Sequence, residues 1–281
     1  MIRLLAAALA ALCLAAPSLA QVPPGADTLD PVLTAQGATG AILVRRLSDG
    51  AEWTGGGERV ERPMIPASTF KIPNALIILE TGVLADPDLD VLAWDGVERS
   101  SGWDQDQTLR TAFRRSAVWA FQRWAREIGQ ERMGEAVSRL EYGNAGIGGP
   151  DDIATFWLQG PLEISAREQV DFLARLHARA LPVEPEVQDQ VIDIMRHRQS
   201  APNDGENWTL YAKTGWAIGD EPNHGWYVGW LAAGEGADAE TWLFAVNVDL
   251  CYETGEGALR ERLARAALVE AGAPQSLIAD D

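Results

Sequence analysis

The segment that decides the fold reads Pro66-Ala67-Ser68-Thr69-Phe70-Lys71-Ile72-Pro73. It places a serine three residues ahead of one of only two lysines in the chain. The other lysine opens the triplet Lys213-Thr214-Gly215, and every other basic residue is an arginine. Side chains three residues apart share one face of a helix. The spacing therefore predicts a helix that begins near Ser68, with the serine at the positive end of the helix dipole and Lys71 beside it.

Ser68 and Lys71 are candidates for a nucleophile and its base. A serine hydroxyl is a poor nucleophile at neutral pH and needs a neighbouring base, but a lysine can serve only after burial or a nearby charge has removed its proton. Taken alone, the Ser-x-x-Lys pattern also fits the start of an ordinary amphipathic helix. The interpretation as a catalytic pair therefore depends on the motifs elsewhere in the chain.

The apolar patterns on either side of this segment predict strands at both ends of the chain and helices between them. Helical periods dominate from about residue 68 to residue 198, and an amphipathic helix over 258–271 follows the last strand. Strand patterns occupy residues 41–47, 51–54, 209–213, 226–231 and 241–250. The first two flank Ser48-Asp49-Gly50, a hairpin signature. The order predicts an α+β fold, in which N- and C-terminal segments form one antiparallel sheet flanked by helices.

The same order predicts two subdomains within a single catalytic domain. We expect a sheet subdomain from residues 21–65 and 207–281, with a mainly helical subdomain, residues 66–206, inserted between its two parts. With 281 residues, the chain is long enough to bury a full hydrophobic core. No internal repeat and no linker between independent domains is visible in the sequence.

Residues 1–20 have the features of a secretory signal. Arg3 precedes an apolar run over residues 4–16, and the small residues Ser18 and Ala20 stand at positions −3 and −1 of a cleavage point. No later stretch has the roughly twenty apolar residues that a membrane span needs. We therefore expect an exported, periplasmic protein without a membrane anchor, in which Cys251 is the sole cysteine and forms no intrachain disulfide.

Charge and histidine spacing argue against two classes of function. A formal net charge of −18 gives a surface that repels phosphate backbones, so nucleic-acid binding is not expected. His177, His197 and His224 lack the spacing of metal ligands, and the chain after residue 20 has no pair of cysteines. We expect no metal in the site.

Six short motifs follow one another along the chain. They are Ser68-Thr69-Phe70-Lys71, Ser116-Ala117-Val118, Tyr142-Gly143-Asn144, Phe156-Trp157-Leu158, Lys213-Thr214-Gly215 and Gly225-Trp226-Tyr227-Val228-Gly229-Trp230. Together and in this order they resemble the class D (oxacillinase-type) serine β-lactamases, within the wider family of penicillin-recognising serine enzymes. The resemblance covers roughly residues 42–263. Class A enzymes carry Ser-Asp-Asn at the second motif, and Ala117-Val118 occupies those places here.

The resemblance implies a modified lysine. In class D enzymes, an apolar pocket keeps the motif lysine neutral enough to react with CO2 and form a carbamate. Here Val118 and Trp157 would wall this pocket around Lys71, and the Trp157 indole N–H would hold the carbamate. Carboxylated Lys71 would take the proton of Ser68 as the serine attacks a β-lactam carbonyl, and would later activate the water that hydrolyses the acyl-enzyme. The resemblance implies no cofactor beyond this CO2 or bicarbonate.

The resemblance also assigns the groups that handle the leaving nitrogen and the developing charge. Ser116 would relay a proton to the β-lactam nitrogen, and Lys213 would supply positive field to that step. The backbone N–H groups of Ser68 and Trp216 would form the oxyanion hole. Trp216 would act there through its main chain.

The remaining assignments concern the substrate and the shape of the site. Arg260 matches the arginine with which the family binds the β-lactam carboxylate, a planar donor suited to a fork contact. Thr214 and Gly215 continue the Lys213 motif into the substrate site. Tyr142 and Asn144 are expected to shape the site rather than to react.

Several alternatives stay open. A penicillin sensor or penicillin-binding protein would carry the same acylated serine but keep the ester. A transpeptidase or carboxypeptidase acting on cell-wall peptides shares the Ser-x-x-Lys and Lys-Thr-Gly motifs. A non-catalytic exported binding module would keep the fold, although the presence of both Ser68 and Lys71 counts against it. The sequence is compatible with a monomer or a homodimer.

Overall fold

The computed structural model describes residues 28–200, 207–219, 223–236, 239–251 and 256–278, so the predicted leader lies outside the described residues. Its helices and strands are, in chain order, α1 Asp30–Ala35, β1 Gly40–Arg46, β2 Glu52–Gly55, α2 Lys71–Glu80, α3 Leu109–Arg115, α4 Val118–Ile128, α5 Gln130–Arg139, α6 Ala166–His177, α7 Pro185–Met195, β3 Arg196–Gln199, β4 Trp208–Ala217, β5 His224–Ala233, β6 Glu240–Asp249 and α8 Leu259–Glu270. Short 3-10 helices are η1 Gly57–Glu61, η2 Ala67–Phe70, η3 Pro150–Asp152, η5 Glu256–Ala258 and η6 Gln275–Ile278.

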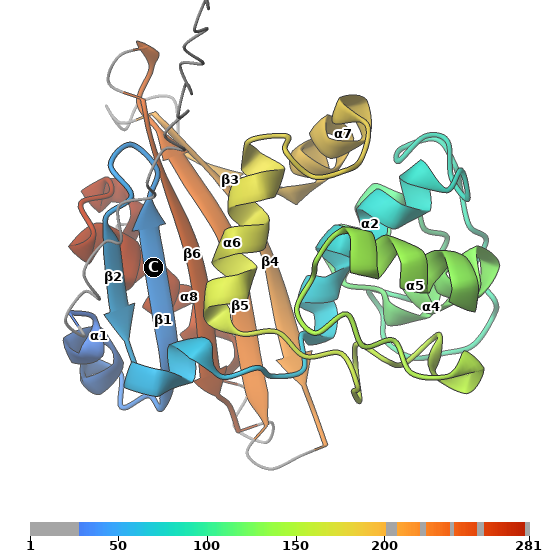
Figure 1. Ribbon diagram of the computed structural model, residues 1–281, viewed down its shortest axis with the longest axis horizontal. Helices are drawn as coiled ribbons and strands as arrows, with labels where there is room; N and C mark the ends of the chain where they lie inside the picture. The colour runs from blue at the N-terminus through green and yellow to red at the C-terminus, as the bar shows by residue number, and fades with distance from the viewer. Residues whose placement is uncertain (1–27, 201–206, 220–222, 237–238, 252–255, 279–281) are drawn as a thin grey trace, which may run out of the picture.

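One six-stranded antiparallel sheet forms one part of the molecule, at the left in Figure 1, and the helices α2, α4 and α5 lie to its right. Its strand order is β2-β1-β6-β5-β4-β3, so the N-terminal hairpin β1-β2 adds to the C-terminal strands through the pairing of β1 with β6. Ile42 of β1 lies opposite Val246 of β6 in this pairing. The predicted α+β class and the combination of N- and C-terminal segments in one sheet are confirmed.

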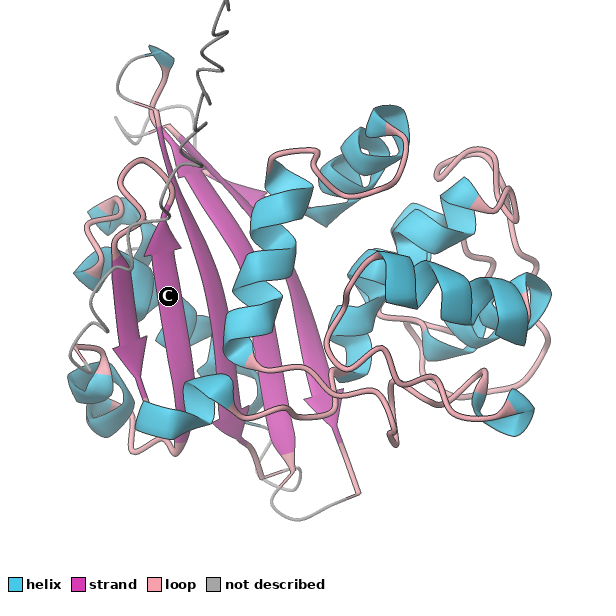
Figure 2. Ribbon diagram, in the orientation of Figure 1, coloured by secondary structure: helices cyan, strands magenta, loops and turns pink. Residues whose placement is uncertain are grey.

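Helices cover both faces of the sheet (Figure 2). Successive strand residues point to opposite faces. Accordingly, Ile42 and Val44 of β1 pack in the cluster that includes Leu263 of α8, whereas Ala41 and Leu43 pack in the cluster shared with α2 and α6. With both faces covered, β1 carries an unbroken apolar run rather than a polar and apolar alternation.

The middle segment differs from the sequence prediction at its C-terminal end. Residues 196–199 form β3, which pairs with the start of β4 around a bulge, although helix was predicted up to residue 198. An exposed edge strand of arginine, histidine and glutamine carries no apolar alternation, so no strand signal was available there. In the same middle segment, α6 packs on β1, β5 and β6.

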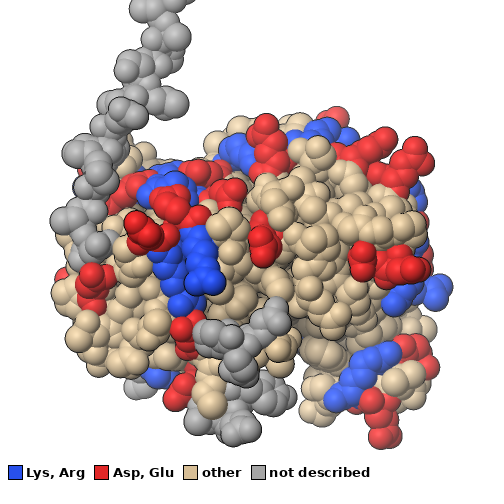
Figure 3. Space-filling model, turned by 60° about the horizontal axis from the view of Figure 1, so that its bottom comes forward, with Lys and Arg blue, Asp and Glu red and all other residues tan. Residues whose placement is uncertain are grey.

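The surface carries mixed charge. On the face shown in Figure 3, acidic and basic side chains are interspersed, and no extended basic area gathers there. Many acidic and basic side chains of the described residues form ion pairs, as Arg167 does with Glu52 and Glu61. Among the described residues, no helix has the length and apolar character needed to cross a bilayer.

Candidate active site

A cavity of about 380 Å³ opens between β4 and the helical part of the molecule. Seven of the predicted site residues line it, namely Ser68, Ser116, Val118, Thr214, Gly215, Trp216 and Arg260. The other three, Lys71, Trp157 and Lys213, are buried. The folded chain thus gathers residues spread over almost two hundred positions of sequence around one cavity.

Ser68 lies in a 3-10 turn rather than in the first turn of the predicted helix. The turn is η2, and α2 begins three residues after the serine, at Lys71. A 3-10 helix has three residues per turn, so side chains at positions i and i+3 eclipse one another. This geometry brings the two functional groups together: Lys71 Nζ donates a hydrogen bond to Ser68 Oγ at 2.8 Å. Pro73 is accommodated in the first turn of α2.

The amine of Lys71 has an apolar surrounding. The residue is fully buried, and its Nζ lies 5.1 Å from the centre of the Phe121 ring. Burial penalises the ammonium form, and the charge of Lys213 adds repulsion, so the pKa of Lys71 falls well below its usual range. An amine with such a pKa can accept a proton from the serine beside it.

Trp157 forms a wall of the buried region beside Ser68. Its ring is stacked on Phe70, the residue before Lys71, with 5.6 Å between ring centres. The side chain is completely buried, and its indole N–H has no hydrogen-bond partner among the described residues. A buried donor left unpaired costs roughly 1–3 kcal/mol. The pocket therefore presents an unused donor next to the segment that carries Ser68 and Lys71.

Ser116 reaches the cavity from the turn between α3 and α4. It caps the C-terminus of α3 in the left-handed region, with φ 57°, an uncommon conformation for a residue other than glycine. Val118 follows as the first residue of α4 and lines the cavity. Backbone strain of this kind tends to gather at functional sites, where the surrounding structure enforces it.

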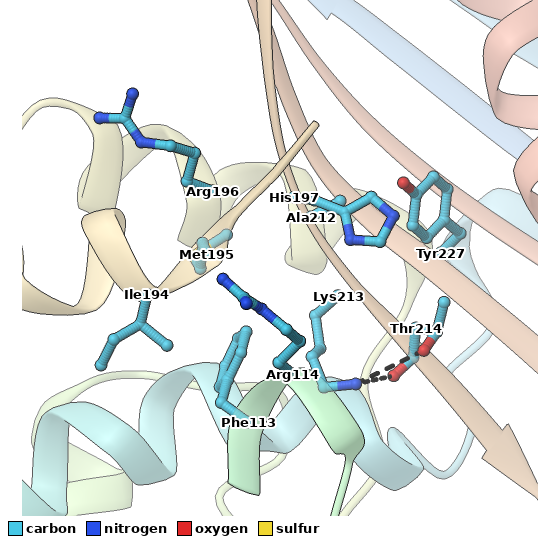
Figure 4. Close-up of a pocket in the computed structure, with 10 residues that line it drawn as sticks. All are labelled: Phe113, Arg114, Ile194, Met195, Arg196, His197, Ala212, Lys213, Thr214 and Tyr227. Atoms are coloured by element: carbon cyan, nitrogen blue, oxygen red, sulfur yellow. Dashed lines mark hydrogen bonds between the residues drawn. The ribbon is translucent and has the colours of Figure 1, made fainter. Parts of the chain in front are cut away.

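Lys213 connects this turn to the sheet. Its Nζ donates to Ser116 Oγ at 3.1 Å and to the carbonyl oxygen of Thr214 at 2.9 Å. Figure 4 shows the amine beside Phe113, with dashed hydrogen bonds to Thr214. Burial, followed by the positive charge of Arg260, lowers the pKa of Lys213 to about 7. Near neutral pH this lysine therefore exchanges between charged and neutral forms.

Gly215 allows the sheet to approach the serine turn. A Cβ on this residue would lie 2.8 Å from the carbonyl oxygen of Pro66 and 3.1 Å from the Thr69 side chain. Any larger residue would push β4 away from η2. The glycine of the Lys-Thr-Gly motif therefore has a steric reason in addition to its place in the cavity wall.

Arg260 adds a cationic group from α8. Its Nη1 donates to the carbonyl oxygen of Gly215 at 2.8 Å, and the guanidinium lies over the Trp216 ring at 5.4 Å. Burial lowers the pKa of this arginine from its usual value. The guanidinium is anchored at the cavity wall, where a carboxylate could reach it.

The two residues expected to shape the site lie behind it. Tyr142 is fully buried and contacts Thr69, the neighbour of Ser68. Asn144 donates to the carbonyl oxygen of Pro161 at 2.9 Å and accepts from the backbone N–H of Glu163 at 3.1 Å. Neither lines the cavity.

The cavity also has walls that the sequence did not reveal. They are Trp103, Leu158, Gln159 and Ile218. Leu158 belongs to the quoted Phe156-Trp157-Leu158 motif, and Trp103 is a large aromatic residue in an otherwise polar loop, which is a weak signal. Ile218 is 56% exposed, an unusual state for an isoleucine, but exposure is visible only in the structure.

The chain is similar to known proteins over most of its length. The family model described as "Penicillin binding protein transpeptidase domain" matches residues 52–269. A β-lactamase, OXA-15 from Pseudomonas aeruginosa, is 37% identical over 249 residues, which are 87% of this chain and 85% of the relative. A class D β-lactamase structure from Nostoc superposes with a TM-score of 0.81 at 38% identity, covering 89% of this chain and all of that chain. This chain belongs to the class D β-lactamase family.

Other class D relatives support the same membership. The FUS-1 (OXA-85) structure from Fusobacterium nucleatum has a TM-score of 0.80 at 34% identity and covers 89% of this chain and 98% of that chain. OXA-48 from Klebsiella pneumoniae is 37% identical over 212 residues, 75% of each sequence. The resemblance inferred from the six motifs is confirmed, and so is the fold that it implied.

Proposed function

We propose that the protein is an exported serine β-lactamase that hydrolyses β-lactam antibiotics through an acyl-enzyme on Ser68. The observation that carries this proposal is the 2.8 Å contact between Ser68 Oγ and the amine of fully buried Lys71. Burial keeps the pKa of that amine low, so it can act as a base at neutral pH. Membership of a family whose named relatives are β-lactamases supports the substrate class. Such an enzyme would confer antibiotic resistance.

We further propose that Lys71 works in its N-carboxylated form. CO2 reacts with neutral amines, and the apolar surroundings of Lys71 keep its amine neutral. The unpartnered indole N–H of Trp157 fits an added carboxyl group, since it is a buried donor without a hydrogen-bond partner among the described residues. The carbamate supplies a proton acceptor for acylation and for the hydrolytic water. Val118 and Trp157 would exclude bulk water from it.

The other site residues then have defined tasks. Ser116, held by the Lys213 amine, would pass a proton to the departing β-lactam nitrogen. The backbone N–H groups of Ser68 and Trp216 would stabilise the oxyanion. Arg260, beside Thr214 and Gly215, would bind the substrate carboxylate.

A second candidate is a penicillin-binding protein in which the ester persists. The match to a penicillin-binding transpeptidase domain favours it, because such domains share the acylated serine. The buried lysine and Trp157 favour the hydrolytic alternative, since they provide for a base that can also activate water.

The test uses the protein without its leader, residues 21–281, mixed with nitrocefin in stopped flow, with and without bicarbonate, followed by intact mass after mixing with a penicillin. We expect multiple turnovers, faster with bicarbonate, and only a transient acyl adduct. A single burst with a stable adduct identifies a penicillin-binding protein or sensor. Full activity in CO2-depleted, mildly acidic buffer refutes the carbamate, and no adduct at all refutes Ser68 as the nucleophile. Gel filtration of the same preparation distinguishes monomer from homodimer.

A further inference from the structure

Three fully buried polar side chains connect α6 to the turn that carries Ser68. Gln169 of α6 donates from Nε2 to Thr69 Oγ1 at 2.9 Å, and Tyr142 donates from its hydroxyl to Gln169 Oε1 at 3.3 Å. Thr69 Oγ1 also lies 3.4 Å from the Tyr142 hydroxyl. All three residues are 0% exposed, so no water competes for these bonds. We refer to them as the Gln169 network.

The direction of the two hydrogen bonds that Gln169 makes in this network is fixed. Thr69 Oγ1 donates to the carbonyl oxygen of Pro66 at 2.8 Å, and a carbonyl can only accept. Thr69 must therefore accept from Gln169, which leaves the amide oxygen of Gln169 to accept from Tyr142. Only a side chain with both a donor and an acceptor can fill this place. An amide does so without a charge, which burial would penalise.

The network acts on a strained part of the backbone. Ala67, between Pro66 and Ser68, has φ 48°, in the left-handed region that disfavours residues with a Cβ. The structure must hold such a residue in place, because relaxation would rotate the turn. The hydrogen bond of Thr69 to Pro66 closes the turn, and Gly215 packs against it from the sheet. Gln169 supports the same turn from α6, through its hydrogen bond to Thr69.

We propose that Gln169 is a positioning residue that fixes the rotation of η2, through Thr69, so that Ser68 Oγ eclipses the Lys71 amine. The inference rests on the proposed function, because it assigns a task toward the Ser68 nucleophile. Gln169 does not line the cavity and so acts on the reaction only through Thr69. Its place on α6, which packs on β1, β5 and β6, ties the turn of the nucleophile to the sheet.

The test is Gln169→Met, which keeps the length of the side chain but removes both polar atoms. A displacement of about 1 Å at a reacting group can cost roughly 10²-fold in rate. We therefore expect the acylation rate constant of Ser68, measured by stopped flow with nitrocefin, to fall about 10- to 100-fold, while the dissociation constant of the initial complex stays within about threefold. Thr69→Val should likewise lower the acylation rate constant and leave the dissociation constant unchanged. Thr69→Ser keeps the hydroxyl and should acylate at the wild-type rate.

Gln188 of α7 provides a matched control. It is also 0% exposed, and it binds only backbone groups, accepting from Leu181 and donating to Val183 at 2.7 Å. Gln188→Met should lower the melting temperature as much as Gln169→Met does, yet leave the acylation rate unchanged. The double variant Gln169→Met with Thr69→Val should acylate no more slowly than Thr69→Val alone, because Thr69→Val already removes the hydroxyl that Gln169 binds, together with the bond of that hydroxyl to Pro66.

Each outcome decides the inference. If both glutamine variants lose stability equally and acylate at the wild-type rate, Gln169 is merely structural and the inference is refuted. If the rate defects of Gln169→Met and Thr69→Val multiply in the double variant, Gln169 does not act through Thr69 and the inference is likewise refuted. Failure of the proposed function looks different, since the wild-type protein itself then forms no acyl adduct.

Discussion

The only two lysines of the chain are both buried in the site, one on a helix and one on the sheet, and their surroundings differ. Lys71 lies beside the Phe121 ring, and in the described part of the chain its one hydrogen-bond partner is the hydroxyl of Ser68. Lys213 reaches three oxygen atoms of Ser116 and Thr214. Burial lowers the pKa of both, but Lys71 falls well below its usual range whereas Lys213 falls to about 7. Burial is the largest cause at both lysines. At Lys213 the negative charge of Glu261 opposes it, whereas at Lys71 the charge of Lys213 adds to it.

The largest effect is expected from Lys71→Met. Loss of the base should lower kcat about 10³-fold. The same variant should be more stable by about 1 kcal/mol at neutral pH in CO2-depleted buffer, because an unfolded chain protonates Lys71 more readily than the folded protein does. Because the pKa of Lys71 is lowered in the folded protein, the destabilisation that Lys71 causes in the wild type grows as pH falls from the usual lysine range. Thermal unfolding at two pH values measures it, and a less stable variant would contradict the argument.

Trp157→Phe tests the role of the Trp157 indole N–H in the buried surroundings of Lys71. The ring is retained and the N–H is lost, so we expect about 10²-fold lower activity at ambient CO2, partly restored by added bicarbonate. Trp208→Phe is the control. Trp208 is also buried, in the core cluster between the sheet and α8, but its indole N–H donates to Ser276. Equal activity of wild type and Trp157→Phe in CO2-depleted buffer is expected as well. If bicarbonate changes the activity of Trp157→Phe only as much as it changes that of the wild type, the indole N–H does not hold the carbamate.

Arg260→Gln addresses the cationic side of the site. A charge-assisted hydrogen bond is worth about 1.5–3 kcal/mol, so KM for penicillins should rise about tenfold or more with kcat little altered. Arg262 is exposed on the same helix, and Arg262→Gln should leave KM unchanged. Steady-state kinetics of both variants suffice. A fall in kcat at constant KM would instead place Arg260 in the chemical step.

The smallest effect concerns pH. Because the pKa of Lys213 is about 7, the ammonium form is lost as pH rises through 7, and KM for a carboxylate substrate should increase several-fold between pH 6 and pH 8.5. The base behaves oppositely, since kcat should fall as pH drops toward the low pKa of Lys71. In Lys213→Arg the rise in KM should disappear, because arginine stays charged. A flat KM in the wild type would show that the charge of Lys213 does not bind substrate.

The sequence identified most of the site because catalytic motifs are local. Ser68 and Lys71 are three residues apart, and the predicted proximity holds, although a 3-10 turn and not the helix itself produces it. By contrast, β3 carries no apolar alternation and was missed. Trp103 and Ile218 reach the cavity from loops, where no periodic pattern marks a side chain as part of a wall.

By itself, the sequence determined that both ends of the chain form one sheet, the two lysine motifs and the family, because each depends on residue types at fixed spacing. The tertiary structure alone decided how the two lysines differ. Their pKa values depend on burial and on charges contributed by distant segments, such as Lys213 for Lys71 and Arg260 for Lys213. It also decided that Gln169, a hundred residues after Thr69, braces the serine turn. Electrostatics and hydrogen bonding act through space, so spacing along the chain could not reveal them.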